Sequence, residues 1–125
     1  MTEDEIGRQV VDVAVKVHRD VGPGLLEMVY EVVLAHELRR GLDVERQVPI
    51  QVTYQRLTLE EAFRVDLLVE NKVIIELKSV ERLSSAHKKQ LLTYLRLTDK
   101  RLGYLLNFST ALMRDGIVRT VNRMR

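Results

Sequence analysis

Apolar residues recur every three to four positions in three stretches of this chain, a spacing that predicts three helices. The stretches are Thr2–Asp20, Leu25–Arg40 and Arg82–Thr98. Thr2 and Glu5 have the spacing of a capping box, which favours a helix start at this point. The glycines and proline at 22–24 end the first helix and turn the chain.

The second helix is expected to bury one side and to carry polar groups on the adjacent side. Its core face is predicted to contain Leu26, Val29 and Val33, flanked by Val32 and Leu34. Gly41 is expected to be its C-cap. Glu27, Tyr30 and Glu31 share the adjacent face because they are three and four residues apart. On spacing alone, Glu27 is explained as a favourable charge at a helix N-terminus.

Runs of β-branched and aliphatic residues predict five strands, at 44–54, 65–69, 73–78, 102–107 and 116–122. Pro49 places the first strand at a sheet edge or a bulge, and residues 55–61 form a polar connection without an assigned structure. The apolar run at 102–107 is typical of a strand buried on both faces. We expect it to lie parallel to 73–78 after a right-handed crossover through the third helix.

The hydrophobic pattern also fixes the register of the hairpin between 65–69 and 73–78. With a three-residue loop at 70–72, one face of the hairpin is wholly apolar. That face would hold Val65, Leu67, Val69, Val73, Ile75 and Leu77. A two-residue loop would mix charge with hydrocarbon on both faces and is disfavoured. The favoured register brings Asp66, Glu76 and Lys78 to the other face.

Two carboxylates and a lysine on one face of an apolar hairpin predict a cation site. Carboxylates in such a place lose hydration and repel each other, and a divalent ion relieves both costs. Mg²⁺ accepts one or two carboxylates together with waters and phosphate oxygens. Lys78 would then orient a metal-bound water or contact a phosphate. The plainer interpretation is a surface hairpin with scattered charges.

Two further features could contact a substrate. Gln90 and Tyr94 lie on one face of the third helix and would reach over the sheet toward a phosphate or a base. The alternative is that they close the edge of the core with satisfied hydrogen bonds. The C-terminal arginines are either a solvated basic end or phosphate contacts. These are Arg114, Arg119, Arg123 and Arg125.

Composition narrows the class of protein. A chain of 125 residues suits one domain, which we expect to span 1–125 as an α/β or α+β fold with a mixed central sheet flanked by helices. The chain has no cysteine, and its three histidines are too dispersed for a zinc signature. No apolar run is long enough to span a bilayer and no signal peptide opens the chain, so a soluble cytoplasmic protein is expected. The net charge of +2 and the pI near 9.0 permit nucleic-acid binding without requiring it.

These motifs together resemble a known family. Asp66 followed by Glu76-Leu77-Lys78 on the next strand resembles the PD-(D/E)xK nuclease superfamily, although Val65 stands where the superfamily name has proline. The segment from Gly24 to Tyr30 resembles the signature of the small GxxExxY proteins, a branch of that superfamily. Residues 90–94 resemble a QxxxY motif, and residues 105–108 resemble an LxNF-type strand.

The resemblance implies a restriction-endonuclease-like core and a metal-dependent nuclease. Asp66 and Glu76 would bind Mg²⁺ or Mn²⁺, with help from the Leu77 carbonyl, and Lys78 would position water or stabilise phosphate charge. Glu27 would be a further catalytic acid. Substrate or lysine placement would be supported by Gln90, Tyr94 and Tyr30. DNA is the favoured substrate, and RNA is the second choice.

Two other function classes stay open at this point. The chain could be a nucleic-acid-binding module that keeps the fold without turnover, although it would then retain costly like charges for no physical reason. It could also be an interaction subunit, either as a homodimer or as a partner of a larger DNA-processing enzyme. A homodimer would offer a longer basic surface to a long substrate.

Overall fold

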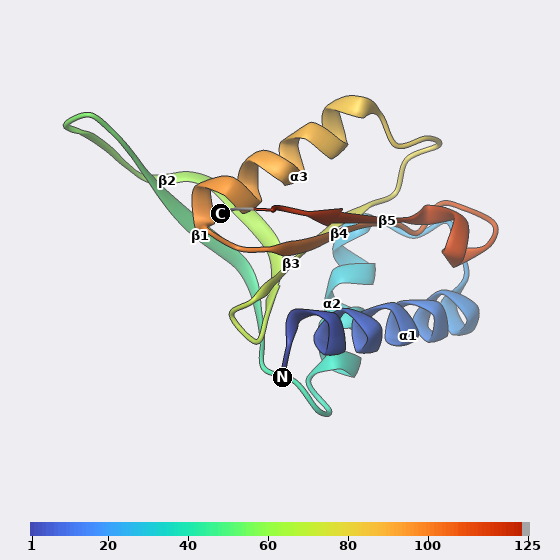
Figure 1. Ribbon diagram of the computed structural model, residues 1–125. Helices are drawn as coiled ribbons and strands as arrows, with labels where there is room; N and C mark the ends of the chain where they lie inside the picture. The colour runs from blue at the N-terminus through green and yellow to red at the C-terminus, as the bar shows by residue number, and fades with distance from the viewer. Residues whose placement is uncertain (124–125) are drawn as a thin grey trace.

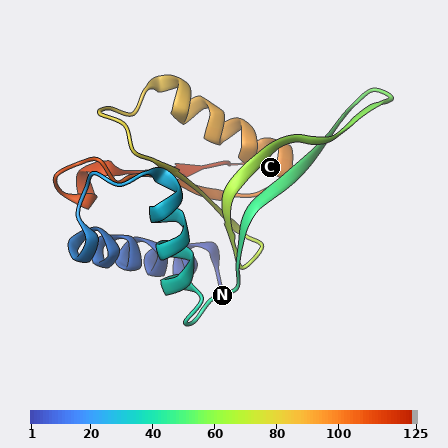
Figure 2. The ribbon, with the colours of Figure 1, turned by 180° about the vertical axis from the view of Figure 1, so that it is seen from behind.

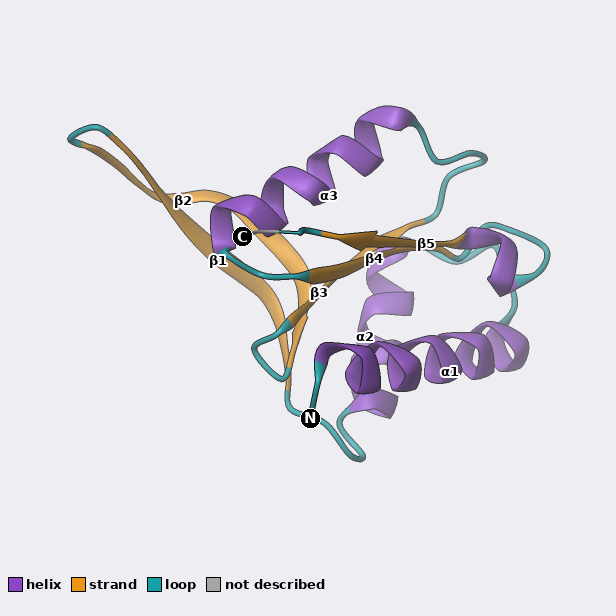
Figure 3. Cartoon of the chain, viewed as in Figure 1, coloured by secondary structure: helices purple, strands orange, loops and turns teal. Residues whose placement is uncertain are grey.

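Five strands pair in the order in which they occur in the chain, and helices cover both faces of the sheet (Figures 1 and 3). The computed structural model that shows this describes residues 1–123. Its elements are α1 Glu3–Val21, α2 Glu27–Leu38, β1 Val44–Tyr54, β2 Leu57–Val69, β3 Val73–Lys78, α3 Ser85–Thr98, β4 Leu102–Asn107, the 3₁₀ helix η1 Met113–Gly116 and β5 Ile117–Val121. Only β3 and β4 pair in parallel, so the predicted mixed sheet is confirmed. Arg125 lies outside the described residues.

The sheet separates two hydrophobic cores. α1 and α2 pack on one face and α3 packs on the other (Figure 3). The larger core joins the two N-terminal helices to residues such as Leu67, Ile75 and Leu106. The smaller core joins Leu91 and Leu95 of α3 to the opposite side of the same strands. All six residues of β4 are buried, as its continuous apolar run predicted.

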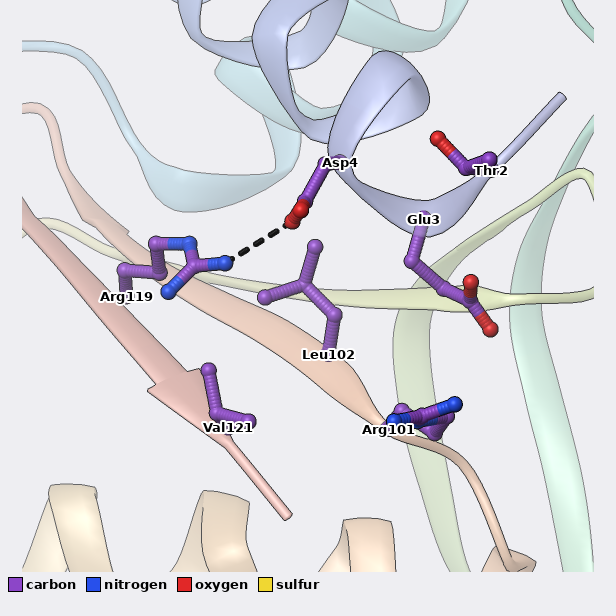
Figure 4. A pocket seen from close by; sticks show the side chains of 7 residues that line it. All are labelled: Thr2, Glu3, Asp4, Arg101, Leu102, Arg119 and Val121. Carbon is purple, nitrogen blue, oxygen red and sulfur yellow. Dashed lines mark hydrogen bonds and ion pairs between the residues drawn. The ribbon is translucent and has the colours of Figure 1, made fainter. Parts of the chain in front are cut away.

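The start of α1 is fixed to β5, the edge strand opposite β1. Thr2 and Glu5 form the predicted capping box of α1. Asp4 then accepts a hydrogen bond of 2.9 Å from Arg119 of β5 (Figure 4). The small cavity beside this pair is lined by Thr2, Glu3, Asp4, Arg101, Leu102, Arg119 and Val121. This end of the sheet is separated from Asp66 by two strands, β3 and β4.

The predicted core face of α2 is wrong at three of its five residues, while Val33 and Leu34 do pack into the core. Leu26, Val29 and Val32 are exposed, at 78%, 41% and 45% of their maximum, while Leu34 is fully buried. α2 is apolar on nearly every side, so hydrophobic spacing could not select the buried face. Tyr30, which stacks on Phe108 at 4.4 Å between ring centroids, is on the buried face instead. α2 also ends two residues before Arg40, and its C-cap is Arg39 rather than Gly41.

The hairpin register is confirmed, but one assignment of face is wrong. Leu67 pairs with Ile75, as predicted for a loop at 70–72. Val65, however, packs in the core of α3 rather than beside Leu67 in the core of α1 and α2. The alternation of β2 therefore changes between these two residues. The adjacent residue of β1 is Gln47, whose φ of 52° departs from a regular strand.

β1 and β2 continue beyond the helices as a two-stranded arm (Figures 1 and 2). The unassigned residues 55–61 form its tip: a turn at Gln55 and Arg56, then the start of β2. Residues 57–62 are all exposed. The register between the two strands shifts between Ile50 and Val52, and this interruption hid the second strand from the sequence pattern. Pro49 lies on β1, at the edge of the sheet, as predicted.

α3 begins at Ser85, three residues later than predicted. Ser84 caps it, with His87 in the reciprocal position of the capping box. Leu91 and Leu95 are buried against the sheet. Between residues 1 and 123, the structure contains no helix with the length and hydropathy needed to span a bilayer.

Candidate active site

Asp66 and Glu76 bind each other's strands through their carboxylates. Glu76 Oε2 accepts a hydrogen bond of 2.7 Å from the N–H of Asp66, and Asp66 Oδ2 accepts one of 2.9 Å from the N–H of Leu77. The paired register of β2 and β3 stops one residue earlier, at Leu67 and Ile75. The two carboxylates therefore satisfy backbone donors at the point where the strands stop pairing, and this holds the acids side by side.

Burial makes the negative charge of this pair costly. Only 6% of Glu76 is exposed. Its burial, reinforced by the charge of Asp66, raises the pKa of Glu76 to about 8. Burial also raises the pKa of Asp66; the hydrogen bond from Leu77 partly offsets this rise, and the charge of Glu31 adds to it. Near neutral pH the pair therefore retains a proton or requires a compensating cation.

Gln47 connects this pair to a third carboxylate, on α2. Its amide nitrogen donates to Glu31 Oε1 at 2.7 Å and more weakly to Asp66 Oδ1 at 3.3 Å. Arg46 Nε donates to the other oxygen of Glu31 at 2.9 Å. Glu31 is only 5% exposed, and Arg46 and the Gln47 amide compensate its buried charge. A left-handed backbone at a non-glycine residue is costly, and Gln47 adopts it where its side chain can span two carboxylates.

Glu27 lies at the start of α2, where the chain meets the end of β3. Its Oε2 accepts a hydrogen bond of 3.1 Å from the N–H of Ser79, and the Ser79 hydroxyl donates to the carbonyl of Leu25. Glu27 also lines a cavity of about 300 Å³ with Met28, Glu31, Arg46, Gln47 and Asp66. The structure therefore brings Glu27 close to Asp66, in addition to its place in the first turn of the helix.

Tyr30 was predicted to support substrate placement, but it is buried in the core and cannot contact a substrate directly. Its ring is 99% buried against Phe108. Its hydroxyl donates to the carbonyl of Gly22 at 2.5 Å and accepts from the N–H of Leu25 at 3.2 Å. Tyr30 therefore fixes the loop that precedes Glu27, and any effect on the site passes through that loop.

Lys78 and Tyr94 both lie within electrostatic reach of the two acids. Burial dominates the pKa of Asp66 and Glu76, but the Lys78 cation acts on both in the opposite direction. Burial, and then the charges of Glu76 and Asp66, raise the pKa of the Tyr94 phenol. Tyr94 also stacks on Phe63 of the arm at 3.9 Å. Gln90 lies one turn earlier on α3 and is exposed.

The chemistry of these donors fits a hard divalent cation. Desolvated carboxylate oxygens at Asp66 and Glu76 repel each other, and Mg²⁺ or Mn²⁺ favours oxygen ligands. Across residues 1–123, no three His, Asp or Glu side chains gather closely enough to hold a metal by themselves. The protein would therefore supply two carboxylates, and water or phosphate oxygens would complete the coordination, as is usual for Mg²⁺.

Three residues of this network were not among the residues predicted for the site: Glu31, Arg46 and Gln47. The signal for Glu31 was available, because it follows Glu27 by one helical turn. Gln47 gave no signal, since a left-handed residue within a strand cannot be read from composition or alternation. Arg46 gave no signal for a different reason, because its contact with Glu31 depends on where β1 passes α2.

Comparisons with known proteins agree with this architecture. The family model described as the PD-(D/E)XK nuclease superfamily matches residues 4–120. Among solved structures, the fold is similar to that in the crystal structure of SSO0001, with a TM-score of 0.54 and 19% sequence identity over 93% of this chain and 67% of that chain. At that identity the likeness concerns the fold alone. The comparison with curated proteins found no match.

Proposed function

The chain belongs to the PD-(D/E)XK nuclease superfamily, and from this premise we propose that it hydrolyses phosphodiester bonds of DNA with the help of Mg²⁺ or Mn²⁺. The observation that best supports this proposal is the reciprocal pair of Asp66 and Glu76, in which burial and mutual repulsion raise the pKa of Glu76 to about 8. Such a pair costs stability unless a cation compensates it. We also assign the chain to the GxxExxY branch, on the segment from Gly24 to Tyr30.

In this proposal, Asp66 and Glu76 hold the ion, with the Leu77 carbonyl as a further ligand. When bound, the ion supplies the activation of water and the neutralisation of charge on the phosphoryl oxygens. Glu76 orients the site by keeping its Oε2 on the N–H of Asp66, which leaves its other oxygen without a donor among residues 1–123. Lys78 contributes a positive charge beside both acids, where it positions water or stabilises the phosphate.

The remaining residues position the substrate or the site. Glu27 is a further acidic group at the cavity, beside Asp66 and Glu31, and holds the end of β3 through Ser79. Tyr94 and the exposed Gln90 lie on α3. Ile74 packs in the core of α3, and Glu76 shares its face of the sheet because the two residues are two apart on β3. We propose that both residues of α3 contact the nucleic acid, and that Tyr30 acts indirectly by holding the loop before Glu27.

The charges of the helices indicate which side would receive a polyanion. α1 and α2 carry eight acidic residues and three lysines or arginines. α3 carries no acidic residue, and its three cations are Lys88, Lys89 and Arg96, all exposed. A phosphate backbone is attracted to the second surface and repelled by the first. This asymmetry supports an approach of nucleic acid from the α3 side of the sheet.

The test is cleavage of labelled DNA and RNA oligonucleotides, single- and double-stranded, with Mg²⁺, Mn²⁺ or EDTA. We expect metal-dependent cleavage by the wild-type protein and none by Asp66→Asn. Cleavage that is equally fast in EDTA would contradict a metal-dependent site. Binding without cleavage in every divalent ion would instead support the non-catalytic binding module.

A further inference from the structure

The tip of the β1–β2 arm exposes apolar side chains that nothing in the described chain covers. Tyr54, Leu57 and Leu59 are 69%, 60% and 47% exposed. The base of the arm is different, because Val48, Ile50 and Phe63 pack against the core of α3. The arm therefore leaves the body of the protein at Phe63 and extends into solvent, as Figures 1 and 2 show from opposite sides.

These apolar residues gather on one face of the arm. Tyr54 pairs with Leu57, and Val52 pairs with Leu59. Cross-strand partners share a face and alternate residues share a face, so all four lie together. The pair between them, Thr53 and Thr58, lies on the other face, where the two hydroxyls are 3.3 Å apart. We call Val52, Tyr54, Leu57 and Leu59 the arm quartet.

A two-stranded ribbon with a bare apolar face is at best marginally stable in water, so the arm quartet requires a partner. We infer that this partner is a second copy of the same chain, and that two arms pack face to face about a two-fold axis through their quartets. This inference concerns assembly and does not rest on the proposed nuclease function.

Charge supports this occupant. When the two-fold axis runs perpendicular to the arms through the quartet, the arms are antiparallel, and the tip of each lies over the base of the other arm's exposed segment. Arg56 is exposed at the tip, and Glu60 and Glu61 are exposed at that base. Arg64 of the same chain pairs with Glu61 at 2.6 Å, so the base keeps a net negative charge that Arg56 of the other arm would meet, twice in the dimer. Nucleic acid is a poorer occupant, because residues 52–62 contain one arginine and two glutamates, a net charge of −1.

The other exposed apolar surface is less suited to this role. Met28, Val29 and Val32 lie on the outer face of α2. Met28 also lines the cavity that contains Glu27 and Asp66. A partner docked on α2 would cover that cavity, whereas paired arms leave it open.

The test is the mass of the full chain in solution, measured by sedimentation or light scattering up to about 100 µM. We expect a dimer that Leu59→Glu weakens roughly 100-fold, because it places a charge at the centre of the apolar contact. Arg56→Glu and Glu61→Arg should each weaken the dimer, and the double variant should restore it. Circular dichroism serves as the folding control, and these exposed positions are not expected to change it.

Val32→Glu is the matched control, because it places the same charge on the competing α2 surface and should leave the dimer intact. A wild-type monomer at 100 µM would overturn the inference. It would equally be overturned by a dimer that survives Leu59→Glu and is lost in Val32→Glu, which would place the interface on α2. A monomer in which Leu59→Glu weakens oligonucleotide binding would assign the arm to nucleic acid instead.

Discussion

The two ends of β2 both contain leucine and acidic residues, but their surroundings are opposite. The outer end, 57–62, carries Leu57 and Leu59 beside Thr58, Glu60 and Glu61 and is exposed throughout. The inner end, 65–69, is apolar with one acidic residue, and every residue except Asp66 is buried. Helices cover both faces of the inner end and neither face of the outer end.

The inner end of β2 therefore lacks compensation for buried charge, whereas the outer end lacks cover for exposed apolar surface. At the inner end two carboxyl groups have been removed from water, so Asp66 and Glu76 together retain a proton or need a compensating cation. At the outer end apolar surface has been left in water, and the arm quartet requires hydrocarbon. The inner end is therefore read as a site for an ion and the outer end as a site for a protein.

The largest effect is expected on catalysis at the inner end. Asp66→Asn and Glu76→Gln keep the hydrogen-bonding shape of each carboxyl but remove its charge, and each should lower the rate of metal-dependent cleavage by at least about 1,000-fold. Lys78→Ala should lower it by about 100-fold or more. Glu60→Gln is the matched control on the outer half of β2, because the exposed Glu60 side chain hydrogen-bonds only to Gln51 among the described residues, and its rate should equal that of wild type. A Lys78→Ala protein that cuts as fast as wild type would refute the role given to that lysine.

The next effect concerns the pH dependence of stability. A carboxyl whose pKa rises from 4.5 in the unfolded chain to about 8 in the folded chain binds its proton more tightly when folded. Its contribution is therefore most favourable below pH 4.5 and is lost as the pH rises to 8, by up to about 5 kcal/mol. Glu76→Gln removes this loss, so in EDTA the variant should be more stable than wild type at pH 8 and similar at pH 5.

Urea denaturation in EDTA at several pH values measures this difference. Added Mg²⁺ should then stabilise the wild type at pH 8 and leave Glu76→Gln nearly unchanged. Glu60→Gln should follow the wild-type curve, since Glu60 is exposed. A wild-type protein whose stability is flat from pH 5 to 8 would show that the buried pair carries no such cost.

A pair of identical substitutions compares the two ends directly. Leu67→Ala empties a fully buried position and should lower the free energy of unfolding by about 2 to 5 kcal/mol. Leu57→Ala, ten residues earlier on the same strand, should change it by less than about 0.5 kcal/mol in the monomer. A Leu57→Ala penalty that grows with protein concentration would belong to the paired arms. Equal penalties at all concentrations would show that the arm packs on its own body.

Much of the inner end was accessible from the sequence. Register follows from a period of two, and a one-residue slip would have mixed charge with hydrocarbon, so the Leu67–Ile75 pairing was determined by the pattern. The face of α2 was not determined, because Leu26, Val29 and Val32 are as apolar as the residues that are buried. Tertiary packing of Tyr30 on Phe108 made that choice. Long-range stacking of this kind has no signature in local spacing.

The residues of the candidate site also divide into those that the sequence pattern predicted and those that it did not. Asp66 and Glu76 lie side by side, as the predicted register required, and Lys78 lies within electrostatic reach of both. Gln47 was not found, because its function depends on a left-handed backbone that reverses the alternation of its own strand. Val65 was assigned to the wrong core because β2 changes its alternation beside Gln47, between Val65 and Leu67. Local rules failed at the position where the strand departs from regularity, and that position borders the site.

The smallest effect tests whether the conformation of Gln47 serves the site. Gln47→Gly relieves the left-handed backbone and removes the amide that bridges Glu31 and Asp66. Affinity for Mn²⁺, measured by titration calorimetry, should fall about tenfold, as for other residues that orient metal ligands. Gln55→Gly is the matched control, because Gln55 has nearly the same φ, 54°, in the turn of the arm and no carboxylate to bridge. Both variants gain the same backbone relief, so the difference between them isolates the amide. If both bind Mn²⁺ as wild type does, the left-handed residue at the inner end is a feature of the strand and not of the site.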